Sequence, residues 1–220
     1  MTIKFIDYLI PPLVRIDEPF RLYETPEGNR YPSVTGIVGL HTEGHINEWI
    51  RKVGEKTAAD ISSRAAARGT LIHENCENYL QGKPLTFSMF QVEEKRMFNH
   101  LLPVLNSITE VHAMETKLYS DKFRCAGTVD LICRDTSGSL MILDWKTSGR
   151  YKDKEDIDHY FMQCAAYAWM FYERTGVAVS KIRIAMTTEE FGLLQFNEEV
   201  KKWLPKFMHL REEYRAVKGL

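Results

Sequence analysis

Two aspartates and a lysine lie on consecutive segments whose residues favour β-strands. Asp130 ends the run Gly127–Asp130, and Asp144 and Lys146 stand two residues apart, on either side of Trp145. Residues two apart on a strand face the same side, so Asp144 and Lys146 are expected to point in one direction. Two carboxylates beside a lysine can hold hard divalent cations that polarise a phosphodiester and activate water, while the lysine stabilises developing charge. The pattern therefore predicts metal-dependent phosphodiester hydrolysis.

A solvated sheet face would show the same letters, so the surroundings of the two aspartates matter. Val129 and Leu131 flank the first, and Leu143 and Trp145 flank the second. Asp is disfavoured in strands and costly to bury unless it is paired or bound to metal. An ion pair with Lys146 accounts for one acid and leaves the other unexplained. We therefore favour the metal-site interpretation.

Further candidates lie on neighbouring segments. Glu115, on the preceding predicted strand, is a candidate metal ligand or a partner of the lysine. His73 and Glu77 are four residues apart on one helix face, where His73 either ligates a metal or belongs to an ordinary surface pair. Gln163 and Tyr167 share a later helix face in the same way. They are either part of a buried amphipathic stripe or contacts to a phosphate or base.

Composition restricts the protein class. The chain has 220 residues, is 44% hydrophobic and 27% charged, and carries a net charge of −1, which is typical of a soluble protein with a full core. Any basic surface must be local. The four cysteines have no CxxC spacing, so we expect free buried thiols and no zinc site. No apolar run reaches about 18 residues, and Asp7 and two prolines interrupt the first segment. We expect a cytoplasmic protein without signal peptide or membrane span.

The positioning elements follow from periodicity and turn residues. Residues 1–32 are proline-rich and irregular, with a hairpin around 26–29. Helical patterns cover 46–80, with breaks expected at Gly54 and Gly69, and 88–107. Strands are predicted at 111–119, 123–134, 139–146, 181–187 and 192–196, and helices at 157–174, ending at Gly176, and 198–217. The simplest interpretation is one domain over 1–220, mostly helical in 1–107, with a sheet core and C-terminal helices in 108–220.

The order of these motifs resembles the PD-(D/E)XK nuclease superfamily, in particular its RecB-like exonuclease branch and the compact single-domain members of phages and mitochondria. The resemblance covers residues from about 32 to 170. It implies an α/β fold with a restriction-endonuclease-like core: a central mixed β-sheet flanked by helices, with a helical N-terminal half. The matching segments, in chain order, are Pro32–Thr35, Gly69–Glu77 with His73, Glu115, Gly127–Asp130, Asp144–Lys146 and Gln163–Tyr167.

The resemblance also implies roles for individual residues. One departure from the motif is Val129, which stands where the superfamily has a variable proline before the first aspartate. The implied catalytic residues are Asp130, Asp144, Lys146 and Glu115; the implied ligands of Mg²⁺ or Mn²⁺ are His73, Asp130, Asp144 and the carbonyl of Trp145; and the candidate substrate contacts are Gln163, Tyr167, Ser33, Thr35 and Arg68.

These roles imply a metal-dependent DNA exonuclease acting on DNA ends or single strands, in recombination, repair or phage DNA metabolism. A protein of recombination or replication is a candidate partner. Three alternatives remain open: a flap or junction endonuclease using the same site, an RNA nuclease, and a non-catalytic DNA-binding protein with a relic nuclease fold. The intact set of Asp130, Asp144 and Lys146 argues against the relic, because nothing in a binding protein requires all three.

Overall fold

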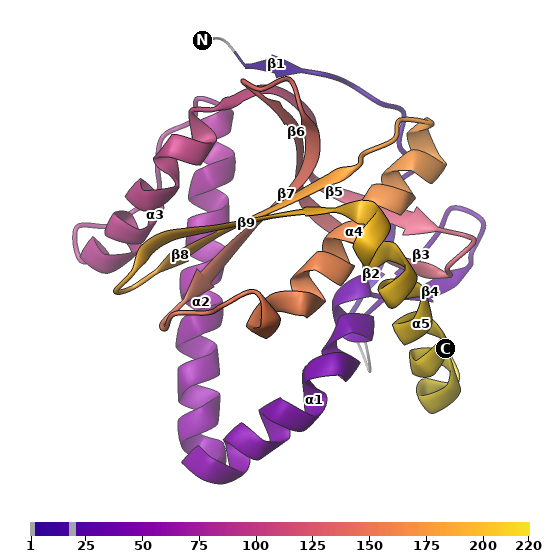
Figure 1. The fold of residues 1–220 in the computed structure, drawn as a ribbon, viewed down its shortest axis with the longest axis horizontal. Coiled ribbons are helices and arrows are strands. Elements are labelled where there is room, and N and C mark those ends of the chain that lie inside the picture. The colour runs from indigo at the N-terminus through magenta and orange to yellow at the C-terminus, as the bar shows by residue number, and fades with distance from the viewer. Residues whose placement is uncertain (1–2, 18–20) are drawn as a thin grey trace.

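The computed structural model describes residues 3–17 and 21–220. A six-stranded sheet runs in the order β1–β5–β6–β7–β8–β9 (Figure 1). The β1–β5 and β7–β8 pairs are parallel and the other pairs antiparallel, so the predicted mixed sheet is confirmed. Its strands are β1 (Lys4–Phe5), β5 (Ile108–Ser120), β6 (Cys125–Asp135), β7 (Leu140–Ser148), β8 (Lys181–Thr188) and β9 (Gly192–Glu199).

Helices cover both faces of this sheet, and each face has its own core. One core joins the sheet to α1, α4 and α5, and the other joins it to α2 and α3. β7 lies between the two cores with most of its residues buried, which is why it forms from an almost continuous apolar run. The helices are α1 (Val34–Val53), α2 (Glu55–Leu80), α3 (Val92–Leu105), the 3₁₀ turn η1 (Glu155–Ile157), α4 (Asp158–Thr175) and α5 (Val200–Lys218).

The N-terminal helices differ from the sequence prediction at two points. Helix α1 begins at Val34, earlier than expected, because Ser33 caps it by accepting the N–H of Gly36 at 3.0 Å. Gly54 separates α1 from α2 as predicted, with φ of +85°. The predicted break at Gly69 is wrong: α2 continues through it, since a glycine inside a helix costs only about 1 kcal/mol relative to alanine.

The first 32 residues contain more strand than predicted. Strands β2 (Val14–Ile16), β3 (Leu22–Glu24) and β4 (Arg30–Pro32) form a small antiparallel sheet, and the hairpin around 26–29 is confirmed between β3 and β4. A single parallel bridge from Ser33 to Ala126 connects this region to β6. Part of the predicted irregular segment, residues 1–2 and 18–20, lies outside the described residues.

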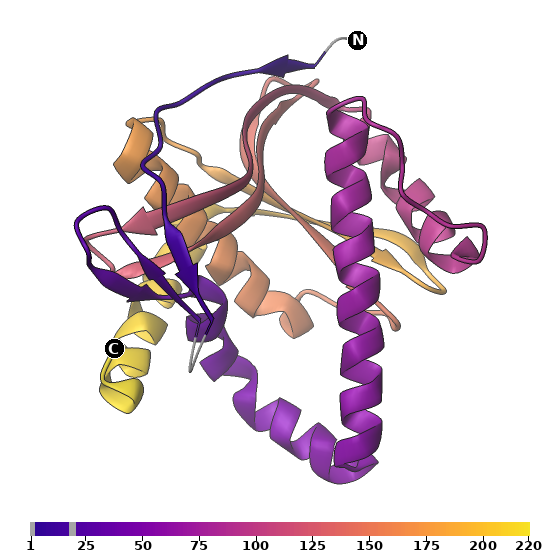
Figure 2. The same ribbon diagram turned by 180° about the vertical axis from the view of Figure 1, so that it is seen from behind.

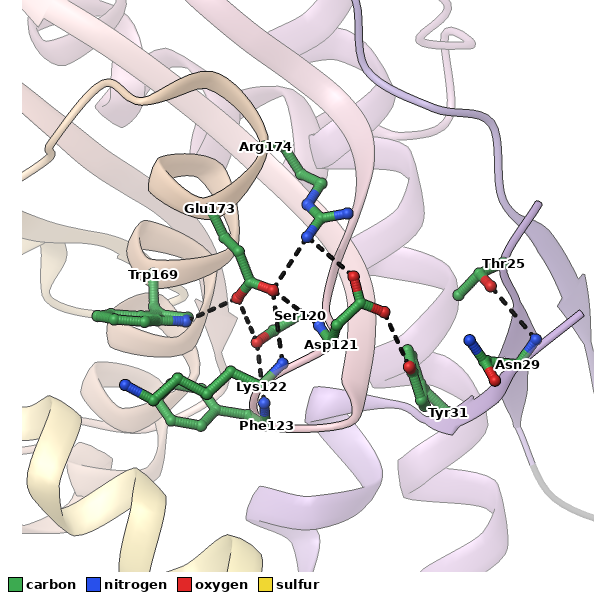
Figure 3. A network of polar contacts seen from close by, with 10 residues as sticks. All are labelled: Thr25, Asn29, Tyr31, Ser120, Asp121, Lys122, Phe123, Trp169, Glu173 and Arg174. Atoms are coloured by element: carbon green, nitrogen blue, oxygen red, sulfur yellow. Dashed lines mark hydrogen bonds and ion pairs between the residues drawn. The ribbon is translucent and has the colours of Figure 1, made fainter. Parts of the chain in front are cut away.

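Helix α4 fixes the turn between β5 and β6 through Glu173 (Figure 3). The carboxylate of Glu173 accepts the Ser120 hydroxyl at 2.6 Å, the N–H of Asp121 at 2.9 Å and the indole N–H of Trp169 at 2.8 Å. Arg174 donates to Glu173 and to Asp121. One acid therefore holds together the helix and the turn between β5 and β6.

Two expectations from composition can be compared with the fold. All four cysteines are free and buried, as predicted. Across residues 3–17 and 21–220, no helix is both long enough and apolar enough to cross a membrane.

Candidate active site

The two aspartates lie where backbone pairing between β6 and β7 ends. The last paired residues are Leu131 and Leu143, and continuing that register would place Asp130 opposite Asp144. Instead, the Asp130 carboxylate accepts the backbone N–H of Trp145 at 3.1 Å through Oδ2. The side chain of Asp130 thus accepts a hydrogen bond from the backbone of β7 just beyond the last paired residues, and its carboxylate lies directly beside β7.

Three side chains that could ligate a metal lie together, and we call them the metal-ligating set. Ligand atoms of His73, Glu115 and Asp130 all lie within 4.8 Å of one another. They come from α2, β5 and β6, and the β5–β6 register places Glu115 opposite Asp130, between the pairs Met114–Leu131 and Thr116–Val129. Two carboxylates with an imidazole suit a divalent cation that prefers oxygen and nitrogen donors.

His73 connects this set to β7. Its Nδ1 lies 3.5 Å from Oδ2 of Asp130, and its Nε2 lies 3.0 Å from the carbonyl oxygen of Trp145. That carbonyl is the fourth donor atom that the resemblance implies. Helix α2 therefore delivers His73 to the point where the Asp130 carboxylate and the Trp145 carbonyl meet.

Asp144 is buried, with 1% of its surface exposed. Its Oδ1 accepts a hydrogen bond of 3.1 Å from Nε2 of Gln163 on α4. Its Oδ2 forms an ion pair with Lys146 but has no well-aligned hydrogen bond. A buried carboxylate oxygen is costly without full compensation, so this atom fits a cation bound beside the set of His73, Glu115 and Asp130.

Burial and the repulsion between neighbouring acids raise the pKa values of Glu115 and Asp144. The pKa of Glu115 is raised to about 7 because surrounding protein removes water from its carboxyl group and because Asp130, Glu77 and Asp144 lie nearby. Burial also raises the pKa of Asp144 to about 6, against the opposing attraction of Lys146. Excess negative charge of this kind is what a divalent cation relieves.

The pKa of Lys146 is raised as well, which for a lysine favours the charged form. Burial alone would lower its pKa, but Asp144 and Asp130 outweigh burial and raise it. The ammonium group is therefore held in its charged form. Its Nζ also lies 4.9 Å from the centre of the Tyr160 ring.

The candidate substrate contacts on α4 are buried. Gln163 is 7% and Tyr167 1% exposed. Gln163 is engaged with Asp144, and Tyr167 packs against β6, where a Cβ added to Gly127 would lie 2.9 Å from its ring. Gln163 thus orients Asp144, and Tyr167 supports the strand that carries Asp130; contact of either residue with DNA stays a prediction.

The remaining predicted contacts each have a partner of their own in the structure. Ser33 is buried as the cap of α1, and the Thr35 hydroxyl donates to it at 3.2 Å. Arg68, which precedes His73 on α2, forms an ion pair with Glu189 in the β8–β9 turn. Pairs between such distant segments leave no periodic signal in the sequence, so Glu189 could not be anticipated. His159 was not anticipated either: its ring packs on that of its chain neighbour Tyr160 with centres 4.0 Å apart, and a single histidine at the start of a helix carries no pattern of its own.

Comparison with known families agrees with this geometry. The family model of the PD-(D/E)XK nuclease superfamily matches residues 47–217, which include every residue of the metal-ligating set. This chain belongs to the PD-(D/E)XK nuclease superfamily. The matched residues of this superfamily member include Val129–Asp130 and Asp144–Lys146, the two segments predicted from the sequence to carry the letters of the motif.

Solved structures similar to this superfamily member are distant in sequence. The crystal structure of SSO0001 has a TM-score of 0.48 and 16% identity, covering 84% of this chain and 74% of that one. A protein from Eubacterium rectale described as a "putative exonuclease" has a TM-score of 0.45 and 15% identity, covering 69% of this chain and 65% of that one. A search of curated proteins gives no match.

Proposed function

We propose that this protein is a deoxyribonuclease of the RecB-like branch, an exonuclease that uses Mg²⁺ or Mn²⁺ and acts on DNA ends or single strands. The observation that carries the proposal is the approach of His73, Glu115 and Asp130 to within 4.8 Å of one another, beside the buried pair of Asp144 and Lys146. Recombination, repair or phage DNA metabolism is the proposed setting.

The residues that would hold the cation are His73, Glu115, Asp130, Asp144 and the carbonyl of Trp145. When bound, the cation polarises the phosphodiester and lowers the pKa of a water molecule. Gln163 keeps Asp144 oriented by donating to Oδ1, and Oδ2, which is paired with Lys146 but accepts no well-aligned hydrogen bond, is the oxygen that would face the cation. The Trp145 N–H fixes the Asp130 carboxylate in the same way.

Lys146 acts as a cation in this scheme. Because the neighbouring aspartates raise its pKa, it remains protonated. Its ammonium group is placed to stabilise negative charge on the phosphate as the transition state forms, and to orient the attacking water by hydrogen bonding. A charged lysine does not serve as the general base.

The shape of the N-terminal half favours ends over internal sites. Helices α1 and α2 meet at Gly54, far from the sheet, and diverge towards it like two legs of an arch (Figures 1 and 2). Near the apex most residues of both helices are exposed, including Ile46 and Ile61. Since α2 also carries His73, a strand that reaches the metal-ligating set passes beside this arch.

Comparing linear with circular DNA tests the preference for ends. A linear single strand and a circular one of the same sequence are incubated with the protein and Mn²⁺, and loss of full-length DNA is followed. We expect the circle to be degraded far more slowly. Equal rates would show that strands enter sideways, and would favour a structure-specific endonuclease on the same site.

A further inference from the structure

A second cation lies against the aromatic ring that Lys146 contacts. Lys152 Nζ is 5.4 Å from the centre of the Tyr160 ring and 3.4 Å from its hydroxyl oxygen. His159 packs on the same ring, with ring centres 4.0 Å apart. Lys152 belongs to the loop between β7 and η1, whereas His159 and Tyr160 begin α4. Three nitrogen-bearing side chains thus converge on Tyr160, next to the candidate active site.

Charge distinguishes Lys152 from the other cations of its loop. Lys154 is paired with Glu198, and Arg150 lies 3.9 Å from Asp156. Lys146 is balanced by Asp144. Within residues 3–17 and 21–220, Lys152 forms no ion pair with any carboxylate. An uncompensated cation beside a catalytic site creates a local positive potential that attracts anions.

The environment of His159 supports this picture. Burial, reinforced by the positive charges of Lys152, Lys146 and His41, lowers the pKa of its imidazole to about 4. The acid next to it in the chain, Asp158, lies towards Lys206 of α5, at 4.0 Å. His159 is therefore a neutral hydrogen-bond donor at neutral pH, placed in a positive field.

We propose that Lys152, together with Tyr160 and His159, binds a phosphate of the substrate strand that neighbours the phosphate being cleaved. The proposal rests on the proposed nuclease function, because it extends the same site along the DNA backbone. A phosphate fits better than a base, since two ammonium groups already lie against the Tyr160 ring. Contacts to phosphate position a strand without reading its sequence.

Binding of DNA as a function of salt concentration tests the site. A fluorescent single strand is titrated with EDTA present and in the Asp130→Asn background, so that no cleavage takes place. Each cation that contacts a phosphate of a single strand contributes about 0.7 to the slope of log K against log salt. Lys152→Ala should weaken binding and reduce that slope by about 0.7, and Lys152→Arg should preserve it. His159→Ala should weaken binding with the slope unchanged, because a neutral donor releases no counterion.

Lys154→Ala is the matched control, because it removes the same charge from the same loop but from a lysine that Glu198 already neutralises. Thermal unfolding of each variant shows that it is folded. If Lys152→Ala behaves like Lys154→Ala, the phosphate site is wrong and the nuclease function stands. The phosphate site is also wrong, and the nuclease function also stands, if no Asp130→Asn protein binds the strand in EDTA while the wild type still cleaves DNA with Mn²⁺. Absence of both binding and cleavage would overturn the proposed function as well.

Discussion

Gln163 donates a hydrogen bond of 3.1 Å to Oδ1 of Asp144, and this contact joins α4 to the buried acid of β7. The bond leaves Oδ2 of Asp144 facing Lys146 without a well-aligned hydrogen bond. A glutamine that is 7% exposed thereby sets the direction of a carboxylate that is 1% exposed.

Gln163→Ala should weaken metal binding, because Asp144 loses the donor that orients it. Loss of a contact that orients a metal ligand typically costs about 10–100-fold in affinity or activity. The measurement is the rise in melting temperature as Mn²⁺ is titrated, which reports binding to the folded state. Gln195→Ala, at an exposed position of β9, should titrate like the wild type. An unchanged Mn²⁺ midpoint in Gln163→Ala would separate Gln163 from the metal site.

Gly127→Ala should destabilise the fold. The added Cβ would lie 2.9 Å from Cε1 of Tyr167, which is buried and unable to move freely. Overpacking of this kind costs about 1–3 kcal/mol, which denaturant unfolding would measure. Gly39→Ala is the control: it meets nothing within 4 Å and lies inside α1, so it should be neutral or stabilising by up to about 1 kcal/mol. Equal stabilities of the two variants would contradict the packing of Tyr167.

Glu115 should make stability depend on pH when no divalent cation is present. Its pKa of about 7 in the folded protein exceeds the ordinary value of 4.5, so between these values the folded state binds more protons than the unfolded state. The free energy of unfolding should therefore fall as pH rises from about 4.5 to about 7. Glu115→Gln should reduce this fall, while Asp144 retains part of it. Melting temperatures in EDTA at pH 5.5 and pH 8 would show the effect.

Divalent cations should reverse this pH dependence, because a cation displaces the proton from Glu115 and is bound more tightly as pH rises. Stabilisation by Mn²⁺ should thus be larger at pH 8 than at pH 5.5. Glu43→Gln, a change on the exposed surface of α1, should keep the wild-type behaviour. A Glu115→Gln protein with the full wild-type pH dependence would show that Glu115 does not carry the shift.

Glu173→Ala should lower the free energy of unfolding by about 2–4 kcal/mol. Several donors, among them the fully buried Ser120 hydroxyl, would lose their acceptor, and an unsatisfied buried donor costs about 1–3 kcal/mol. Glu213→Ala, which removes an exposed pair with His209, should cost less than about 1 kcal/mol. Denaturant unfolding of both variants measures the difference, and equal costs would contradict the role of Glu173 at the β5–β6 turn.

The strands and helices of the second half could be predicted because their signals are local. The turn at Asp135–Gly138 and the stop at Gly176, which adopts a left-handed conformation, both follow from residue type alone. Apart from the hairpin of β3 and β4, the strand pairs formed by residues 1–32 could not be predicted in this way. β1 pairs with β5 across about a hundred residues, and the three residues of β2 carry too short a pattern.

In the candidate site, too, local relationships could be predicted from the sequence, whereas contacts between distant segments could not. Asp144 and Lys146 share a strand face because side chains alternate along a strand, so their meeting is encoded in a spacing of two. The approach of His73 and Glu115 to Asp130 depends on how α2 and β5 pack against β6, which only the motif order suggested. The burial of Gln163 and Tyr167 was open in the sequence, because helix periodicity fits both a core face and a binding face. The catalytic and metal-binding roles themselves stay predictions.

Cleavage of a linear single-stranded oligonucleotide, labelled separately at each end, is the most direct test of the central claim. Wild type, Lys146→Ala and the exposed control Lys201→Ala are compared with Mg²⁺ or Mn²⁺ and with EDTA, after unfolding curves establish that each is folded. The account predicts metal-dependent products from the wild type and the control, loss of products with Lys146→Ala, and a label pattern showing removal from an end. Products that persist in EDTA or in Lys146→Ala would contradict it.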